Sequence, residues 1–264
     1  MSVMNKHNTQ LKALILDMDG VLWHGDRPLG DLPAIFNEIE LLGLQVCLAT
    51  NNATLTADQF VEKLKRFGVD LGVHQIVNSA EAVGSYLKAI YPAGGSVYII
   101  GESGLRSTLA RYGFTHAESD ILAVVAGMDR QLTYDQLKKG TLFIRAGTPF
   151  IGTNPDRSYP TPEGLVPGAG AILAALESAS GIEPLIIGKP KPAMYLLSLK
   201  RMGVAPGETL VIGDRLETDI IGAQAIGCKT GLVLSGVTTE ADALQWQPPV
   251  DIIDSDLTAL LAKL

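Results

Sequence analysis

Short apolar runs alternate with amphipathic helical patterns from residue 13 onward. Ala13 to Leu16 is an uninterrupted apolar run and predicts a short buried strand. Between Leu32 and Leu42, apolar residues recur on one face of a helix, and Gly43 ends that pattern. Predicted strands over 44–49 and around 76–77 follow, with a helix over 57–67 between them. Strands that alternate with helices predict an α/β fold with a doubly wound, Rossmann-like parallel sheet.

The same alternation returns near the end of the chain. Predicted strands cover 210–213, 229–234 and 251–253, with a helix to about residue 226 and a closing helix over 257–264. The middle has predicted strands over 97–100, 123–127 and 150–153 and then a long loop, Asn154 to Gly168, rich in Pro, Gly and polar residues. Such loops are usually functional or disordered. We interpret the middle, which also contains strand–helix units, as a second α/β domain inserted into the first. The predicted boundaries are 1–79 and 184–264 for the core and 80–183 for the inserted domain.

The composition of the chain argues against several kinds of binding partner and location. The 264 residues carry a net charge of −7, which disfavours nucleic acid and anionic membranes because both reward a basic face. Cys47 and Cys228 have no metal-ligand spacing, and Cys47 lies in an apolar run that predicts a small core residue. Residues 1–10 are polar without a signal-peptide core, and no run reaches 18 apolar residues. We therefore expect a cytoplasmic protein.

Two aspartates follow the first predicted strand directly. Asp17 and Asp19 would lie at the carboxyl end of a parallel strand, where two carboxylates repel each other unless a cation intervenes. One interpretation is a Mg²⁺-dependent phosphoryl-transfer site with Asp17 as nucleophile. The alternative is a strand that ends in a turn, since Asp and Gly are common turn residues. An EF-hand is excluded, because Pro28 stands where its bidentate Glu is needed.

Other polar residues also lie at predicted strand ends. Thr50 and Asn51 follow the second strand and could bind phosphoryl oxygens, although Thr and Asn also form ordinary helix caps. Lys189, in Gly-Lys-Pro-Lys-Pro, is the better candidate for a phosphate contact, whereas Lys191 is expected to be a solvated charge. Asp214 ends a late strand, and Asp219 lies near a helix start, where acidic residues are common for dipole reasons alone.

Alternative phosphate and hydrolase motifs are missing from the sequence. There is no Gly-x-Gly-x-x-Gly, and Gly188-Lys189 lacks the remaining positions of a P-loop. The four histidines are scattered along the chain and form no ligand pair. A histidine-centred hydrolase is therefore not expected.

In this order the motifs resemble the haloacid-dehalogenase superfamily. Its sequence of Asp-x-Asp, Thr or Ser, Lys and an acidic pair is matched by Asp-Met-Asp-Gly, Thr-Asn-Asn, Gly-Lys-Pro and Gly-Asp-Arg-Leu-Glu-Thr-Asp. Residues 152–157 and 164–168 are similar to the NagD-like, p-nitrophenyl-phosphatase-like branch with a large cap, and the resemblance covers nearly the whole chain. Trp23 stands where that branch usually has Tyr.

The resemblance implies a Mg²⁺-dependent phosphomonoester hydrolase. Asp17 would become an aspartyl phosphate, and Asp19 would act as general acid and then as general base. Mg²⁺ would be held by the carboxylates of Asp17 and Asp214 and the backbone carbonyl of Asp19, with Asp219 orienting waters or Lys189. Thr50, Asn51 and Lys189 would bind the phosphate.

The cap is expected to choose the substrate by closing over the leaving group. Asn154, Asp156 and Arg157 are the candidates to face it, with Asp129 and Arg130 as further ones; the alternative is that the loop residues only stabilise the loop. Small phosphate esters such as sugar phosphates and nucleoside monophosphates suit this branch, and its caps often form homodimers.

Two other functions use similar residues. A phospho-acceptor receiver module would be about half as long, with an adjacent acidic pair early in the chain. A phosphomutase would pass the aspartyl phosphate to a sugar instead of water, so released inorganic phosphate distinguishes it from a hydrolase.

Overall fold

The computed structural model describes residues 10–161 and 163–264. The chain forms two compact units: unit 1 comprises the residues up to Cys47 together with Ser198–Leu264, and unit 2 comprises Leu48–Leu197. The cap boundaries expected from the sequence, 80 and 183, stay a prediction. Residues 1–9 of the polar segment at the start of the chain, which include His7, are not among the described residues.

Unit 1 is built on parallel strands. Their hydrogen-bonded order is β15 (Ile252–Asp254), β14 (Lys229–Val233), β13 (Thr209–Gly213) and β1 (Ala13–Leu16). Every residue of β1 and β13 is buried, which explains why these strands are continuous apolar runs in the sequence. Strand β4 (Gln45–Thr50) begins in this unit, where the Gln45 amide donates to the Lys12 carbonyl at 3.0 Å, and ends in unit 2.

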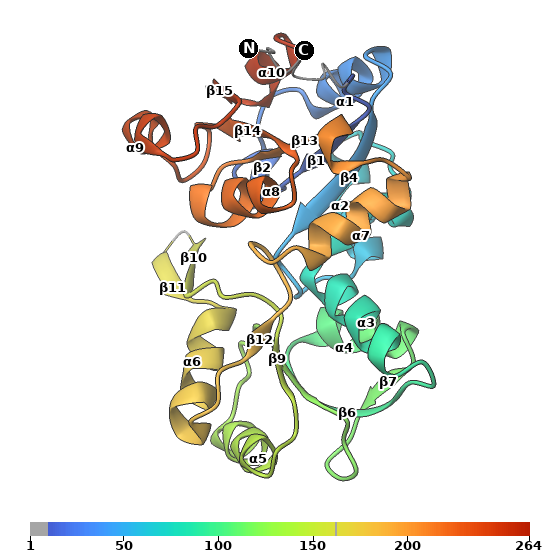
Figure 1. Ribbon diagram of the computed structural model, residues 1–264, viewed down its shortest axis with the longest axis vertical. Coiled ribbons are helices and arrows are strands. Elements are labelled where there is room, and N and C mark those ends of the chain that lie inside the picture. The colour runs from blue at the N-terminus through green and yellow to red at the C-terminus, as the bar shows by residue number, and fades with distance from the viewer. Residues whose placement is uncertain (1–9, 162) are drawn as a thin grey trace, which may run out of the picture. The chain divides into compact units, whose positions relative to one another are not determined.

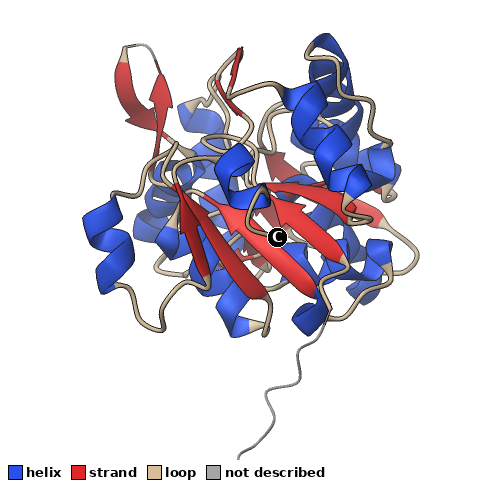
Figure 2. Cartoon of the chain, turned by 90° about the horizontal axis from the view of Figure 1, so that it is seen from above, coloured by secondary structure: helices blue, strands red, loops and turns tan. Residues whose placement is uncertain are grey.

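Helices lie on both sides of the strands (Figure 2). Asp31 caps α1 (Leu32–Leu41) by accepting from the Ala34 amide, and α1 buries Leu32, Ile35 and Ile39. Leu42, predicted to share that face, follows the helix end and is 36% exposed. The remaining elements of unit 1 are short: β2 (Trp23–His24), β3 (Arg27–Pro28), η2 (Pro206–Glu208), η3 (Leu216–Ile220), α8 (Ile221–Ala225), α9 (Glu240–Gln245) and α10 (Leu257–Leu261). Helix α7 (Ala193–Met202) begins in unit 2 and ends in unit 1.

Both cysteine thiols are buried in this structure. Cys47, on β4, is completely buried, and burial raises the pKa of its thiol to about 11. Burial likewise raises the pKa of Cys228 to about 12. The prediction that Cys47 is a core residue is confirmed.

Unit 2 contains two sets of parallel strands. The end of β4 pairs with β5 (Ile76–Asn78), and the second sheet has the order β12 (Leu185–Ile186), β9 (Phe150–Gly152), β8 (Val124–Ala126), β6 (Gly95–Ile100) and β7 (Phe114–His116). Helices α5 (Tyr134–Arg145) and α6 (Ala169–Ser180) pack side by side on this sheet (Figure 1). Apolar residues of the second sheet and of these two helices form one core, which includes Tyr98, Val124, Phe150 and Leu176.

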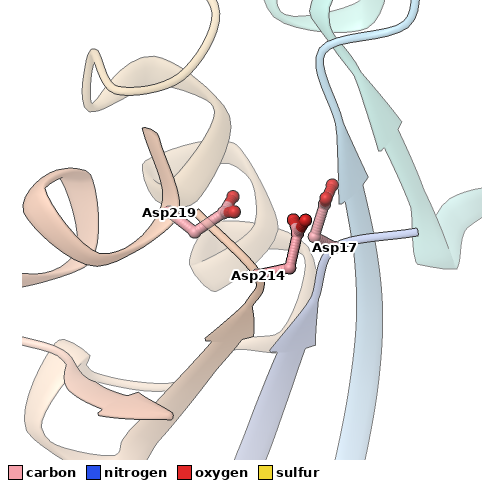
Figure 3. A group of neighbouring side chains, drawn as sticks. All are labelled: Asp17, Asp214 and Asp219. Atoms are coloured by element: carbon pink, nitrogen blue, oxygen red, sulfur yellow. The ribbon is translucent and has the colours of Figure 1, made fainter. Parts of the chain in front are cut away.

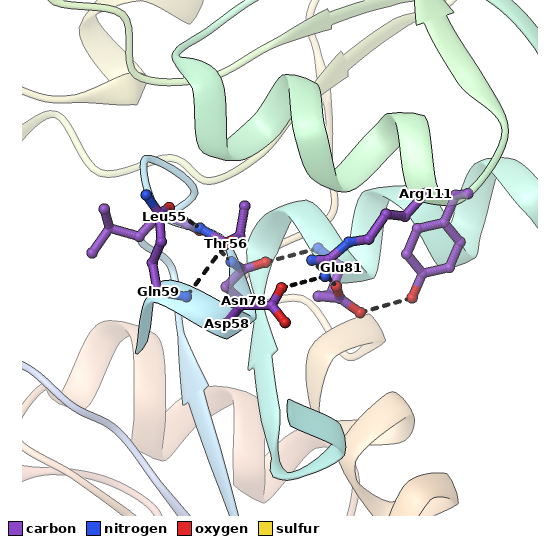
Figure 4. A network of polar contacts seen from close by, with 8 residues as sticks. Leu55, Thr56, Asp58, Gln59, Asn78, Glu81 and Arg111 are labelled. Carbon is purple, nitrogen blue, oxygen red and sulfur yellow. Dashed lines mark hydrogen bonds and ion pairs between the residues drawn. The ribbon is translucent and has the colours of Figure 1, made fainter. Parts of the chain in front are cut away.

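Three helices of unit 2 are joined by a polar network (Figure 4). They are α2 (Ala57–Arg66), α3 (Ser79–Ile90) and α4 (Ser103–Arg111); η1 (Val73–Gln75) precedes β5. Arg111 of α4 forms ion pairs with Asp58 of α2 and Glu81 of α3. The Asn78 side chain caps α3 through the Glu81 amide at 2.9 Å and donates to the Leu55 carbonyl at 2.8 Å. The network therefore holds α4 against the segment that follows β4.

One prediction about this unit is wrong. The expected loop from Asn154 to Gly168 contains an antiparallel hairpin, β10 (Ser158–Thr161) paired with β11 (Gly164–Pro167). Each strand carries a proline, and their polar and apolar residues do not alternate regularly, so the sequence pattern is that of a loop. Backbone pairing forms the hairpin nonetheless.

Across the residues that the structure describes, no helix combines the length and the apolar character that a membrane crossing requires.

Candidate active site

Three aspartates of unit 1 bring their carboxylates together (Figure 3). Asp17, Asp214 and Asp219 each offer one oxygen, and these oxygens all lie within 4.8 Å of one another. Asp214 is 2% exposed and Asp219 is 1% exposed, while Asp17 is half-buried. We call this group the acidic cluster.

The sheet explains why these residues meet. Asp17 is the first residue after β1 and Asp214 the first after β13, and these neighbouring strands run parallel. The Asp17 amide continues the ladder by donating to the Ile212 carbonyl at 2.9 Å. Parallel strands end at the same edge of a sheet, so both carboxylates emerge there. The one-turn π-helix η3 then carries Asp219 back to this edge, and the Asp219 carboxylate accepts from the Arg215 amide at 3.2 Å.

Three glycines leave room for the buried carboxylates. A Cβ at Gly20 would lie 2.5 Å from Asp214 Oδ2, and one at Gly236 would lie 2.0 Å from the same atom. A Cβ at Gly213 would lie 2.3 Å from the Cβ of Asp219. Such distances are shorter than real side chains tolerate, so the cluster exists only with glycine at these positions.

The acidic cluster has the donor chemistry of a magnesium site. Like charges 4 to 5 Å apart repel by roughly 3 to 4 kcal/mol per pair at an effective dielectric constant near 20. The Asp214 carboxylate accepts a hydrogen bond from the Val237 amide at 2.9 Å, which offsets part of this repulsion. Hard divalent cations prefer carboxylate oxygens, and Mg²⁺ is typically bound by one or two of them with waters and phosphate. The residues present therefore fit Mg²⁺.

Asp19 is not one of the three residues of the acidic cluster, and it is exposed. Its Oδ1 accepts a hydrogen bond from the indole Nε1 of Trp23 at 3.0 Å, and Trp23 is 1% exposed. The chain bends back between these residues because Gly20 has φ +83°, and its amide donates to the Trp23 carbonyl. A buried, rigid indole thus orients the Asp19 side chain.

The predicted phosphate-binding residues lie in unit 2. Thr50 is 3% exposed and its hydroxyl accepts from the Asn52 amide at 3.2 Å. Lys189 is 3% exposed and donates from Nζ to the Ala49 carbonyl at 2.9 Å, so its ammonium group lies beside the end of β4. The Asn51 side chain accepts a hydrogen bond from the Lys189 amide and donates one to the Lys189 carbonyl. Lys191 is exposed, as predicted.

The expected substrate-facing residues have different environments. Asn154 is 5% exposed and donates to the Asn51 carbonyl at 2.8 Å. Asp156 is half-buried and accepts from the Asn51 side chain at 3.1 Å. Arg157 is exposed. Their role toward a substrate stays a prediction, since their observed contacts are with the protein itself.

Unit 2 also has a cavity of about 500 Å³ between the β10–β11 hairpin and the segment after β8. Asp129 and Arg130, predicted as further candidates, line it. Glu102 holds Arg130 in place with bonds of 2.6 Å to Nε and 2.7 Å to a terminal nitrogen. These bonds keep the pKa of the Glu102 carboxyl below its usual value. The remaining lining residues are mostly apolar or weakly polar: Met128, Leu132, Tyr159, Thr161, Glu163, Val166, Pro167 and Ile172.

Some of these residues had no assigned role in the sequence. Trp23 follows Asp19 by four positions, so their closeness in the sequence could have indicated this contact. Gly236 lies in a turn with no motif around it, and Ser79, which donates to the Asn51 carbonyl at 2.6 Å, is 28 positions from its partner. Sequence patterns of short period do not reveal such contacts.

Comparison with known proteins places the whole chain in one family. The haloacid dehalogenase-like hydrolase family matches residues 14–115, and a HAD-hydrolase-like family matches residues 186–260. An acid sugar phosphatase of Staphylococcus aureus is 34% identical over 256 residues, which covers 97% of this chain and 98% of the relative. The similarity therefore includes the middle of the chain as well as its two ends.

Solved structures agree. A p-nitrophenyl phosphatase from Archaeoglobus fulgidus superimposes with a TM-score of 0.91 at 28% identity, covering 97% of this chain and all of that one. NagD from Escherichia coli gives 0.87 at 31% identity, covering 94% and 97%. A glycerol phosphate phosphatase from Mycobacterium tuberculosis, solved in complex with magnesium, gives 0.87 at 33% identity, covering 95% and 76%.

These matches confirm the fold and the family expected from the motifs, and they favour an enzyme over a receiver module. Phosphatases of this family use Mg²⁺, in keeping with the acidic cluster. The chain is a phosphatase that belongs to the haloacid-dehalogenase-like hydrolases, in the branch of NagD and the p-nitrophenyl phosphatases.

Proposed function

We propose that this phosphatase hydrolyses monophosphate esters of small metabolites, sugar phosphates in particular, through a phosphorylated Asp17. The acidic cluster carries the proposal, because it puts a half-buried carboxylate beside two buried ones at the carboxyl edge of the sheet. The sugar phosphate class rests on the 34% identical acid sugar phosphatase, and the glycerol phosphate phosphatase also acts on a small ester.

In the proposed reaction Asp17 attacks phosphorus in line with the ester oxygen. The bond from phosphorus to the ester oxygen breaks, and the leaving oxygen takes a proton from Asp19. Asp19 then accepts a proton from water, whose oxygen attacks the phosphorus of the aspartyl phosphate. The bond between Asp17 and phosphorus breaks, inorganic phosphate leaves, and the Asp17 carboxylate and the protonated form of Asp19 are restored. The hydrogen bond from Trp23 supports this role for Asp19, since it fixes the side chain that must serve twice.

The charges in the site need balancing. We assign Mg²⁺ to the carboxylates of Asp17 and Asp214 and the backbone carbonyl of Asp19, with Asp219 orienting the surrounding waters. When bound, the ion would offset part of the negative charge of the cluster and of the phosphoryl oxygens. Lys189, Thr50 and the Asn51 segment would contact the phosphate, Lys189 with its positive charge.

Selection of the alcohol part of the ester is assigned to the inserted domain. Its cavity has apolar walls and three charged lining residues, Asp129, Arg130 and Glu163, which suits a leaving group with both apolar and polar parts. Asn154, Asp156 and Arg157 remain further candidates. A homodimer through the cap and a cytoplasmic location are also proposed, on the sequence resemblance and composition.

A panel of phosphate esters tests the proposal. With Mg²⁺, the protein should release inorganic phosphate from p-nitrophenyl phosphate and from sugar phosphates; EDTA should abolish release and excess Mg²⁺ should restore it. Activity that is indifferent to EDTA would exclude the metal assignment. An isomerised sugar phosphate without released phosphate would instead establish the mutase alternative.

A further inference from the structure

The Asn51 side chain is fully engaged by the backbone of Lys189 and by Asp156. Its Oδ1 accepts from the Lys189 amide at 2.8 Å, and its Nδ2 donates to the Lys189 carbonyl at 3.1 Å and to Asp156 Oδ2 at 3.1 Å. An amide group has two hydrogens to donate, and both have acceptors here. The side chain is 9% exposed. It is therefore occupied by the protein, although the sequence predicted a phosphate ligand.

Asn51 is itself held in place. Its backbone carbonyl accepts two hydrogen bonds, from Asn154 Nδ2 at 2.8 Å and from Ser79 Oγ at 2.6 Å. Asn154 follows β9 and Lys189 follows β12, and these two strands pair in parallel. The ends of two adjacent strands are thus tied to the segment after β4 through one asparagine.

Gly188 shows how close this contact is. A Cβ at Gly188 would lie 2.7 Å from Asn51 Oδ1 and 2.3 Å from the Thr153 carbonyl oxygen. The Gly188 amide donates to that same carbonyl at 2.8 Å. The chain before Lys189 therefore lies directly against Asn51, with no room for a side chain between them.

A lysine needs such a support if its ammonium group must be placed accurately. Its four-carbon stem has many rotamers, so the position of Nζ is determined by where the backbone starts and by what the ammonium group bonds. Here the backbone is fixed on both sides by Asn51, and Nζ donates to the Ala49 carbonyl, two residues before Asn51. The same segment thus fixes both ends of Lys189.

We propose that Asn51 is a positioning residue for Lys189, and that Asn154 acts through Asn51 in the same way. Asn51 does not bind the phosphate through its side chain; it holds the cation that does. The inference rests on the proposed function, in which Lys189 neutralises the phosphoryl group.

A double-mutant cycle tests this proposal. The variants are Asn51→Ala, Lys189→Met and the double variant, and the probe is orthovanadate, a tetrahedral phosphate mimic, titrated calorimetrically with Mg²⁺ present. Asn51→Ala should weaken vanadate binding and lower kcat/KM for p-nitrophenyl phosphate by about 10²-fold, the cost of a misplacement of about 1 Å. In the Lys189→Met background the same substitution should change vanadate affinity by about 2-fold or less, because it acts through the lysine.

Asn78→Ala is the matched control. Asn78 is a buried asparagine of the same unit whose side chain bonds Leu55 and Glu81, so its loss lowers thermal stability without touching Lys189. Its vanadate affinity should stay within about 2-fold of the parent. If Asn51→Ala fails to fold, Gly188→Ala replaces it in the cycle, since its methyl group displaces Asn51 from the same backbone.

The two proposals fail differently. An equal loss of vanadate affinity from Asn51→Ala in both backgrounds would overturn the positioning role and restore Asn51 as a direct ligand. No loss in either background would overturn both roles of Asn51. Full vanadate affinity in Lys189→Met would instead contradict the proposed role of Lys189.

Discussion

Gly236 lies against Asp214 so closely that a Cβ at this glycine would come within 2.0 Å of the Asp214 Oδ2 atom. The Val237 amide that follows the glycine donates to the same oxygen at 2.9 Å. The turn at 236–237 therefore fixes one oxygen of a proposed magnesium ligand, and only glycine allows the approach.

Gly236→Ala should displace the Asp214 carboxylate without removing it. We expect Mg²⁺ affinity to fall at least tenfold and the free energy of unfolding to drop by about 1–3 kcal/mol, the usual cost of overpacking. Mg²⁺ titration of activity and thermal unfolding measure the two effects. Gly207→Ala is the control, because a Cβ there meets no atom within 4 Å. Equal Mg²⁺ affinity in both variants would contradict the role of the turn.

Asp214→Asn should separate metal binding from folding. The amide can still accept from Val237 through Oδ, but one charge leaves the acidic cluster. Without Mg²⁺ the variant should therefore be more stable than the parent, by about 1–3 kcal/mol for a relieved repulsion of this size. Mg²⁺ should raise the melting temperature of the parent and leave that of the variant nearly unchanged. A variant that gains as much from Mg²⁺ as the parent would remove Asp214 from the ligand set.

Trp23→Phe removes the indole N–H that bonds Asp19 while keeping an aromatic ring in the core. Loss of one hydrogen bond to a charged group, about 1.5 kcal/mol, should lower kcat about tenfold if the bond holds Asp19 for proton transfer. Trp246→Phe is the matched control, since Trp246 also donates through its indole, to Gln224 at 3.3 Å. The idea would be wrong if both variants kept the kcat of the parent.

Glu102→Gln should weaken the interaction that holds Arg130 in place, and its effect on the free energy of unfolding should depend on pH. Because Arg130 lowers the pKa of Glu102 in the folded state, the pair stabilises the fold above the unfolded pKa of about 4.5, and this contribution is lost as the pH falls below it. The pair is partly exposed, so the difference in unfolding free energy between parent and variant at pH 7 should be about 1 kcal/mol or less. It should disappear once the pH has fallen through the lowered folded-state pKa of Glu102. Denaturant unfolding at several pH values measures it.

The same variant tests the cavity. If Arg130 contributes to ester selection, Glu102→Gln should change the relative kcat/KM values across the sugar phosphate panel while p-nitrophenyl phosphate is affected least. If the relative kcat/KM values do not change, Arg130 has no role in selecting the ester.

The parallel strands were predictable from the sequence for a physical reason. Strands such as β1 and β13 are buried on both faces, so they are continuous apolar runs, and an aspartate immediately after each run indicates its end. Asp17 and Asp214 could be assigned to one sheet edge because parallel neighbours end together. Helix α1 also followed its pattern, with Leu32, Ile35 and Ile39 buried.

Other features have no short-range signal. The β10–β11 hairpin depends on backbone pairing between segments that contain prolines, and the π-helical turn that carries Asp219 has no sequence pattern of its own. Asn51 meets Lys189 across 138 positions, and only the folded chain shows that this asparagine serves the lysine backbone. An amide near a predicted phosphate site is equally consistent with both roles when only the sequence is considered.

Chemical trapping of the phosphorylated protein tests the central claim, that Asp17 accepts the phosphoryl group. The protein is mixed with substrate and Mg²⁺, quenched and reduced with borohydride, which converts an aspartyl phosphate into homoserine, and the peptide containing residue 17 is sequenced by mass spectrometry. The account predicts homoserine at position 17, none in Asp17→Asn, and a turnover in that variant reduced by about 10⁴-fold or more with its fold intact. Homoserine at another aspartate, or full turnover in Asp17→Asn, would contradict it.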